Sequence, residues 1–267
     1  MSSSDPVFPF PGRIVKVGDA GPVTVLRIQE RLNAVGCGPL EENGIFDQKT
    51  ENAVKLFQMR FSDVSNRPLE VDGEVGSITW GALFGAESVP SSTESPSKLI
   101  EAVINFAKTQ IGIREKPLGS NRGTEVDEYL RTVGIDLTHG GKAWCVAFTY
   151  YCYAKAANDL AMQNPHIKTA GVLDHWHQAQ VKPKVICVKN SDAIADPSLV
   201  QPGSLFIIDH GGGLGHSGLV IEVSNGRLVT IEGNTNNDGS RNGIGVFKRD
   251  ARKISKINKG FIDYSSF

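Results

Sequence analysis

The sequence has no surplus of charge of either sign and no long apolar run. Its 28 Lys and Arg residues are balanced by 29 Asp and Glu residues, which gives a formal net charge of −1. A basic surplus is typical of nucleic-acid binding, so this balance argues against a nucleic acid as partner. The longest apolar stretch, around residues 205–208, is far shorter than the ~18 residues of a membrane-spanning helix. It predicts a buried strand, and no membrane span is expected.

Cysteine is too sparse for a disulfide scaffold. The four residues Cys37, Cys145, Cys152 and Cys187 show no CxxC spacing. Residues 1–12 contain neither the basic segment nor the apolar core of a secretory signal peptide. We therefore expect synthesis in a reducing cytoplasm with free thiols. If the protein acts outside the cell, a route other than general export must deliver it.

Apolar residues and glycine are plentiful. The apolar fraction of 40% is enough to build true cores. The 29 glycines and 13 prolines point to a loop-rich, partly β architecture. Residues 86–97, AESVPSSTESPS, have little to bury and are interpreted as a linker. This linker divides the chain into two predicted domains, residues 13–85 and residues 98–267.

Residues 13–85 contain an internal repeat. The run 43–47, Asn-Gly-Ile-Phe-Asp, leads to Thr50, and 29 residues later the run 72–76, Asp-Gly-Glu-Val-Gly, leads to Thr79. Each copy is a glycine turn, an apolar residue and a Thr that can cap or open a helix. We predict three short helices with two turns, although a generic small helical bundle fits the periodicity equally well. The first helix is indicated by Val25, Ile28, Leu32 and Val35 at helical spacing, with Gly36 after them.

This segment resembles the family of small peptidoglycan-binding modules over its whole length. The family usually has glycine where this sequence has Asp47. Because Asp tolerates left-handed backbone better than most residues, we expect the turn to survive. The resemblance implies that the module binds peptidoglycan through the loops and helix starts around the two glycine turns. The matching residues are Leu26, Gln29, Leu32 and the runs 44–50, 57–58, 72–76 and 79–83.

In the second segment, Cys145 is the candidate nucleophile. Amphipathic helices are predicted over 98–111 and near 126–133. Glycines precede Cys145 and the apolar run 146–156 follows it, which predicts a helix that begins at Cys145. The helix dipole and free backbone N–H groups at such a position favour a thiolate. A buried small hydrophobe explains a lone cysteine equally well. Cys152, two turns further along the same face, is interpreted as a core residue.

A predicted hairpin supplies partners for Cys145. A strand over 204–208 and a glycine-rich turn lead to His216, which opens a strand to residue 223; a return strand covers 227–234. We expect Leu219 opposite Ile231 and Ile221 opposite Val229, because this register buries the apolar residues of both strands on one face. It requires a three-residue loop over 224–226. In this register His216, Glu232 and Asn234 share the other face.

These residue types form a nucleophile, a base and orienting groups. The Cys145 thiolate would attack a carbonyl, and its backbone N–H would stabilise the oxyanion. His216 would take the thiol proton and return it to the leaving amine. Glu232 or Asn234 would hold the second imidazole nitrogen in the productive tautomer. The pattern predicts amide-bond cleavage.

The segment 98–267 resembles the CHAP family of cysteine, histidine-dependent amidohydrolases and peptidases. The resemblance rests on Trp144-Cys145, on 215–218 and on 232–234. It implies an α+β, papain-like fold in which the helix bearing the Cys packs on an antiparallel sheet, beside a three-helix peptidoglycan-binding domain. It also implies Cys145 as nucleophile, His216 as base, Glu232 as orienting acid and Asn234 as a supporting polar group.

No metal or cofactor is expected. Some CHAP members bind calcium through an Asp-rich loop before the cysteine, but residues 118–124 contain no acid. His175, His177 and His210 lack the ligand spacing of a zinc site.

The candidate substrate-binding residues are Trp144, Asn121 and Trp176. A role in packing is the alternative for Trp176, and a role in loop closure for Asn121, Arg122 and Asp127. The basic run 248–259 is interpreted as a solvated face that could help dock on anionic wall polymer.

Together these patterns predict a peptidoglycan hydrolase that cuts an amide bond in the peptide part of the wall. We expect it to act in the cell wall or periplasm, either as a phage lysin (endolysin) or as an injected antibacterial effector. The second case implies delivery machinery and an immunity protein. The alternatives are a catalytically inactive wall-binding protein and a cytosolic thiol amidase acting on a small conjugate.

Overall fold

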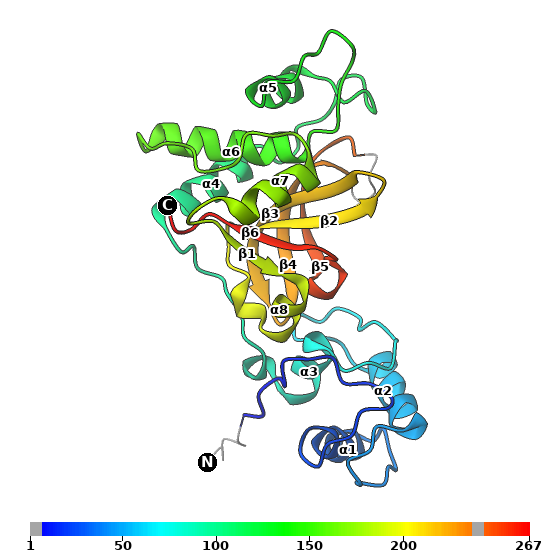
Figure 1. Ribbon diagram of the computed structural model, residues 1–267. Helices are drawn as coiled ribbons and strands as arrows, with labels where there is room; N and C mark the ends of the chain where they lie inside the picture. The colour runs from blue at the N-terminus through cyan, green and yellow to red at the C-terminus, as the bar shows by residue number, and fades with distance from the viewer. Residues whose placement is uncertain (1–6, 237–242) are drawn as a thin grey trace. The chain divides into compact units, whose positions relative to one another are not determined.

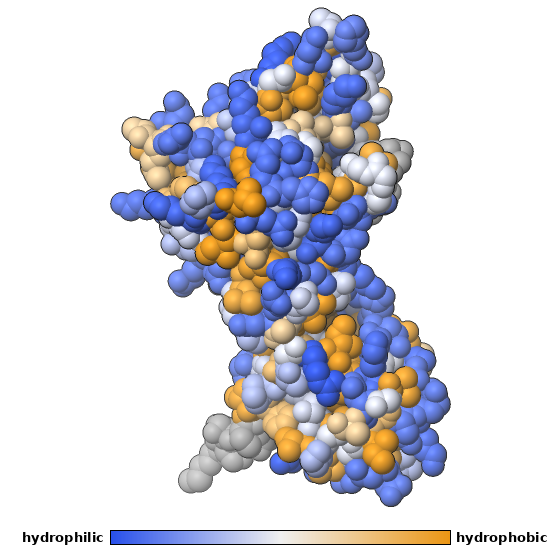
Figure 2. Space-filling view, in the orientation of Figure 1, coloured by the Kyte–Doolittle hydropathy of each residue, from blue (hydrophilic) through white to orange (hydrophobic). Residues whose placement is uncertain are grey.

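The computed structural model describes residues 7–236 and 243–267 (Figure 1). The chain divides into two compact units, and the main division lies between Ser91 and Ser92, inside the predicted linker. A short segment, Ile194–Pro197, groups with the N-terminal unit. Within the described ranges, no helix is long and apolar enough to cross a membrane. Figure 2 shows polar residues over much of the visible surface of both units, with apolar residues in small groups.

The N-terminal unit is built from α1 (Thr24–Ala34), α2 (Gln48–Arg60) and α3 (Ser77–Phe84), followed by a short 3₁₀ helix, Ala86–Ser88. The predicted first helix is α1. It ends just before Gly36, whose φ of 74° lies in the left-handed region that favours glycine. The apolar stripe of α1 packs into a core with residues from the other two helices. This core includes Val25, Ile28, Leu32, Phe57, Trp80 and Leu83.

The internal repeat is also a repeat of side-chain hydrogen bonds. Buried Gln29, from α1, binds the first glycine turn: its Oε1 accepts from Gly44 N at 2.9 Å and its Nε2 donates to Ile45 O at 3.0 Å. Gln58, 29 positions later on α2, makes the same bonds to Gly73 N at 2.9 Å and Glu74 O at 3.0 Å. Each of these two helices therefore fixes the glycine turn that follows it in the chain.

The backbone at Asp47 differs from the expectation. Asp47 has φ −89° and ψ −176°, which is extended and not left-handed. It is the N-cap of α2, and its side chain accepts from Thr50 N at 2.8 Å. Gly76, the equivalent N-cap of α3, has nearly the same backbone, with φ −87°. The turn survives at Asp47 because the position needs a cap rather than left-handed backbone.

The second unit has an antiparallel six-stranded sheet, among the described residues, in the order β1-β6-β2-β3-β4-β5. The unit is α+β. Its helices are α4 (Lys98–Thr109), α5 (Thr124–Thr132), α6 (Cys145–Asp159), α7 (Val172–Val181) and α8 (Asn190–Ala195). Its strands are β1 (Ile186–Lys189), β2 (Leu205–Gly211), β3 (Leu214–Ser224), β4 (Arg227–Thr235), β5 (Gly245–Lys253) and β6 (Gly260–Asp263). Short 3₁₀ helices cover Pro197–Leu199 and Ile254–Lys256.

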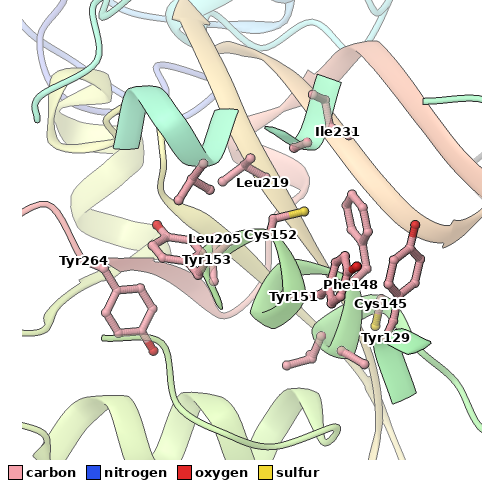
Figure 3. Packing of buried hydrophobic residues seen from close by; sticks show 14 of the residues in the cluster. Tyr129, Cys145, Phe148, Tyr151, Cys152, Tyr153, Leu205, Leu219, Ile231 and Tyr264 are labelled. Atoms are coloured by element: carbon pink, nitrogen blue, oxygen red, sulfur yellow. The ribbon is translucent and has the colours of Figure 1, made fainter. Parts of the chain in front are cut away.

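One large core joins the sheet to the helices α4, α5, α6 and α7. From the sheet it takes Leu205, Leu219 and Ile231, and from α6 it takes Phe148 and Cys152 (Figure 3). Cys152 is only 1% exposed, which confirms its predicted place in the interior. Burial raises the pKa of the Cys152 thiol far above its ordinary range. Cys152 is therefore a packing residue, and the two cysteines of α6 lie in different environments.

The β3–β4 hairpin confirms one predicted pairing and corrects another. Leu219 lies opposite Ile231, as expected. However, Val229 faces Glu222 and not Ile221, because the register shifts between Val220 and Glu222. Ser224 pairs with Arg227, so the turn has two residues, Asn225 and Gly226, with φ of 50° and 80°. Both positive values suit a two-residue Asn-Gly turn, and a bulge at Ile221 compensates for the shorter loop.

Candidate active site

Cys145 is the first residue of α6, as predicted, and it lies on a pocket of about 330 Å³. Its side chain is nearly buried at 3% exposure. The helix amino terminus directs free backbone N–H groups and the positive end of the dipole toward this position. The residues that line the pocket include Asn121, Cys145, Gly171, Leu214, His216 and Asn234.

His216, on β3, joins Cys145 to Glu232 on β4. His216 Nε2 donates to Glu232 Oε2 at 2.8 Å, and the ring also hydrogen-bonds with Cys145. Because Glu232 occupies Nε2, Nδ1 is the ring nitrogen left for the contact with Cys145. Glu232, rather than Asn234, is thus the partner of the second imidazole nitrogen. The structure brings together the predicted nucleophile, base and orienting acid.

Glu232 is fully buried and accepts from several donors at once. Arg252, on β5, forms a two-pronged ion pair: its Nε donates to Oε1 at 2.5 Å and its Nη2 to Oε2 at 2.6 Å. Thr230 Oγ1 donates to Oε1 at 2.6 Å. The guanidinium also lies 4.6 Å from the ring centre of Phe206, which packs against His216. The carboxylate is therefore held from two sides before any substrate binds.

The charges in this cluster shift each other's proton affinity. Burial raises the pKa of Glu232, but its hydrogen bonds and charge contacts with Arg252 and His216 outweigh burial and lower that pKa to about 2. Burial lowers the pKa of His216, but Cys145 and Glu232 outweigh it and raise that pKa to about 9. Both shifts favour the charged forms, a Glu232 carboxylate and a protonated His216 ring. Perturbed pairs of this kind concentrate at functional sites.

Two glycines allow these side chains to approach closely. A Cβ on Gly218 would lie 2.7 Å from Cγ of Glu232, and a Cβ on Gly233 would lie 2.7 Å from Trp144 Cζ3 and from Phe148 Cβ. Real side chains do not tolerate such distances. The glycine at 218 makes room for the carboxylate, and the glycine at 233 lets the start of α6 lie against β4.

The remaining predicted site residues lie in different places. Asn234 has a left-handed φ of 54° and lies on the pocket beside His216. Asn121 also lies on the pocket. Trp144 is fully buried and Trp176 is 4% exposed, and both belong to the core rather than to the pocket lining. We therefore assign no substrate contact to either indole in the proposal below.

The structure gives a role to Arg252 and Glu115 that the sequence did not predict, and it fits one stated alternative. Arg252 belongs to the basic run 248–259, interpreted as a solvated face, yet it binds a fully buried carboxylate. Buried Glu115 had no predicted role, although its Oε1 accepts from Trp144 Nε1 at 2.9 Å. Arg122, in the loop before α5, forms an ion pair at 2.8 Å with Asp127 in the first turn of α5, which fits the loop-closure alternative.

Two histidines outside the pocket, His166 and His175, contribute to packing. His175 Nε2 hydrogen-bonds with Tyr264 Oη at 2.7 Å inside the core, and His166 stacks on His175 with 4.4 Å between ring centres. Burial lowers the pKa of His175 to about 3 and that of His166 well below its ordinary value. In residues 7–236 and 243–267, no group of three or more His, Cys, Asp or Glu side chains is arranged to hold a metal ion.

Comparison with known families agrees with both resemblances. Residues 23–83 match the family model described as "Putative peptidoglycan binding domain", and residues 137–234 match the CHAP domain model. The chain therefore contains a peptidoglycan-binding domain followed by a CHAP domain. The first match includes both glycine turns, and the second includes Cys145, His216, Glu232 and Asn234. No curated protein and no solved structure matches the chain. The two domains support a role in peptidoglycan hydrolysis or binding.

Proposed function

We propose that this protein is a peptidoglycan hydrolase that cuts an amide bond in the peptide part of the wall by cysteine nucleophilic catalysis. The observation that carries the proposal is the chain of contacts from Cys145 through His216 to Glu232 beside a pocket. Its setting in a chain with a peptidoglycan-binding domain and a CHAP domain supports the wall as substrate. In this proposal the catalytic fold is papain-like.

The geometry supports a two-step acyl transfer. The Cys145 thiolate attacks the amide carbonyl carbon and forms a C–S bond. As the C–N bond breaks, the His216 Nδ1 proton passes to the leaving amine. His216, now neutral, takes a proton from water, which attacks the thioester and releases a carboxylate and the free thiol. Glu232 keeps Nε2 protonated throughout, so that Nδ1 is the nitrogen that exchanges protons.

The backbone N–H of Cys145 is the proposed donor to the oxyanion of the tetrahedral intermediate. It belongs to the first turn of α6, where N–H groups have no intrahelical partner. A preorganised donor of this kind is worth roughly 10²–10³ in rate in enzymes where one has been removed.

The N-terminal unit is proposed to hold the insoluble polymer for the catalytic unit. Tethering a binding module to an enzyme raises the local substrate concentration without any new contact at the catalytic site. Deletion of residues 1–85 should therefore reduce digestion of whole walls much more than cleavage of a short soluble muropeptide. An equal loss on both substrates would contradict the anchoring role.

Digestion of purified peptidoglycan tests the catalytic proposal. The intact protein should release fragments with new amine and carboxyl termini, and mass spectrometry of the fragments identifies the bond that is cut. Cys145→Ala should release none, while Cys152→Ala, as a matched control on the same helix, should retain cleavage. Equal product from intact protein and Cys145→Ala would overturn the mechanism.

The same experiment distinguishes the competing functions. An inactive wall-binding protein would cosediment with walls and release nothing. A cytosolic amidase would cleave small soluble conjugates and neither bind nor digest walls. The buried, charged contacts around His216 favour the hydrolase, because charges are costly to bury without a function that uses them.

The proposed place of action is the cell wall or periplasm, reached either by phage-type release or by injection as an antibacterial effector. Expression with and without an added export signal tests the place of action. Lysis only with the signal, abolished by Cys145→Ala, is the expected result. Rescue of the exporting strain by a protein encoded beside this one would favour the effector origin and identify an immunity protein.

A further inference from the structure

Glu115 is a buried carboxylate that the proposed mechanism does not use. It is 1% exposed and lies between α4 and α5. Its backbone is fixed to the sheet edge at the start of β5, since Glu115 N donates to Ile244 O at 2.8 Å and Val246 N donates to Ile113 O at 2.9 Å. A carboxylate fixed in this way is a rigid acceptor for whatever donors lie near it.

The two carboxylate oxygens of Glu115 bind two different parts of the site. Oε1 accepts from Trp144 Nε1 at 2.9 Å, and Trp144 is the N-cap residue immediately before Cys145. Oε2 accepts from the backbone N–H of Asn121 at 3.0 Å, and Asn121 lines the same pocket as Cys145. One side chain thus links the start of α6 to a wall of the pocket.

The backbone around Asn121 is closely constrained. Asn121 has a left-handed φ of 53°, a region that residues other than glycine seldom adopt but that Asn tolerates better than most. Gly141 lies so close to it that an added Cβ would contact the carbonyl oxygen of Asn121. Lys116 N closes the loop by donating to Arg122 O at 2.9 Å. The Glu115 bond holds the N–H of Asn121 in this conformation from the inside of the molecule.

We infer that Glu115 is a positioning residue that keeps the pocket wall at Asn121 and the nucleophile at Cys145 in a fixed relation through its bonds to Asn121 N and Trp144 Nε1. This inference rests on the proposed function, and Glu115 is not one of the three residues Cys145, His216 and Glu232 that the proposed mechanism uses. Glu115 touches no reacting atom and acts through its two partners. A shift of about 1 Å between catalytic groups costs on the order of 100-fold in rate.

Glu115→Gln tests the inference, because glutamine keeps the shape but has one acceptor oxygen for two donors. In the full-length protein, kcat/KM for a soluble muropeptide should fall about 10- to 100-fold, mainly through kcat. The matched control is Glu125→Gln, an exposed glutamate at the start of α5, which should leave kcat/KM unchanged. An unchanged kcat/KM in Glu115→Gln would overturn the inference.

A double-mutant cycle with Trp144→Phe separates positioning from general destabilisation. Trp144→Phe removes the indole N–H. In the double variant Glu115→Gln/Trp144→Phe, the one amide oxygen of residue 115 therefore has a single donor left, the backbone N–H of Asn121. In the Trp144→Phe background, the further change Glu115→Gln should lower kcat/KM by less than about twofold. If the two substitutions acted independently, the fold losses of the single variants would multiply in the double variant. Multiplied effects would overturn the inference. So would equal effects at Trp144→Phe and at Tyr129→Phe, which removes a hydrogen bond to Gln110 from the ring that packs on Trp144.

A readout without substrate distinguishes failure of this inference from failure of the proposed function. Alkylation of Cys145 by iodoacetamide, followed by mass spectrometry of its peptide, should be several-fold slower in Glu115→Gln than in the intact protein or in Glu125→Gln. If the intact protein cuts no wall but this difference is seen, the proposed function is wrong and the positioning role stands. Equal alkylation rates with an active intact protein would overturn the positioning role alone.

Discussion

The two units bury polar side chains of different kinds. In the N-terminal unit, the buried amides of Gln29 and Gln58 are neutral and bind the backbone of the glycine turns. In the second unit, His216, Glu232 and Arg252 form a charged cluster beside the pocket. Neutral amides that satisfy turns stabilise a fold, whereas buried charges carry a desolvation cost that a fold alone does not require. The difference distinguishes buried amides that hold turns from a buried charged cluster at the candidate active site.

The largest expected effect on stability is at Arg252. Arg252→Met leaves the Glu232 carboxylate buried without its strongest partner, and breaking a buried pair from one side costs about 3–5 kcal/mol. Urea unfolding of the full chain measures the change. Lys248→Met, at an exposed position of the same strand, should change the free energy of unfolding by less than ~0.5 kcal/mol. Similar small effects at both positions would show that the charged cluster is not held as described.

Acid should weaken the second unit through His166 and His175. Both have folded-state pKa values below the ordinary value, so the unfolded chain binds more protons below pH ~6.5 and stability falls as the pH drops. Between pH 7 and pH 5 the expected loss is about 2 kcal/mol per histidine. Urea unfolding at both pH values measures it. His175→Gln should reduce the loss, whereas His177→Gln, at an exposed site two residues on, should not.

Removal of a buried amide in the N-terminal unit should have a smaller effect. Gln58→Ala leaves the N–H of Gly73 and the carbonyl of Glu74 without their partner, and an unsatisfied buried group costs about 1–3 kcal/mol. Gln29→Ala should cost a similar amount at the first turn. Hydrogen exchange of the full chain, read in peptides from residues 24–84, measures both. Unequal protection losses would contradict the equivalence of the two turns.

The smallest effects are expected at the helix N-caps. Asp47→Ala removes the bond to Thr50 N and should cost about 1 kcal/mol. Gly76→Asp introduces the same cap on α3, where an added Cβ meets only Ile14 Cγ1 at an ordinary 3.7 Å, and should stabilise by a few tenths of a kcal/mol. Thermal unfolding of the two variants should therefore shift in opposite directions. Shifts of the same sign would disprove the shared N-cap geometry.

Local patterns in the sequence predicted much of the fold. Helical spacing and a glycine stop gave α1, and glycines followed by an apolar run gave the start of α6 at Cys145. The pairing of Leu219 with Ile231 followed from burial of alternate apolar residues. The bulge at Ile221 did not follow from this alternation. A two-residue turn with a bulge and a three-residue turn give the same alternation of buried residues further along the strands, so the apolar pattern does not distinguish them.

The rest of the site depends on contacts between distant residues. Arg252 looked like part of a charged surface, since nothing near it in sequence shows that β5 lies beside Glu232. Glu115 is 29 residues before its partner Trp144, and a single Glu in a loop gives no signal of burial. The indoles of Trp144 and Trp176 were expected at the cleft, because an aromatic residue has the same local pattern in a core as beside a ligand.

The pH dependence of kcat/KM above neutrality tests most directly whether the buried charges work as one unit, because kcat/KM reports the pKa values of the free enzyme. Activity of the intact protein should fall as His216 loses its proton near pH 9, because the leaving amine then receives none. Glu232→Gln removes a charge that raises the pKa of His216, so its residual activity should fall at a lower pH. Glu222→Gln, on the neighbouring strand, should leave the profile in place. Coincident alkaline limits for the intact protein and Glu232→Gln would contradict the account.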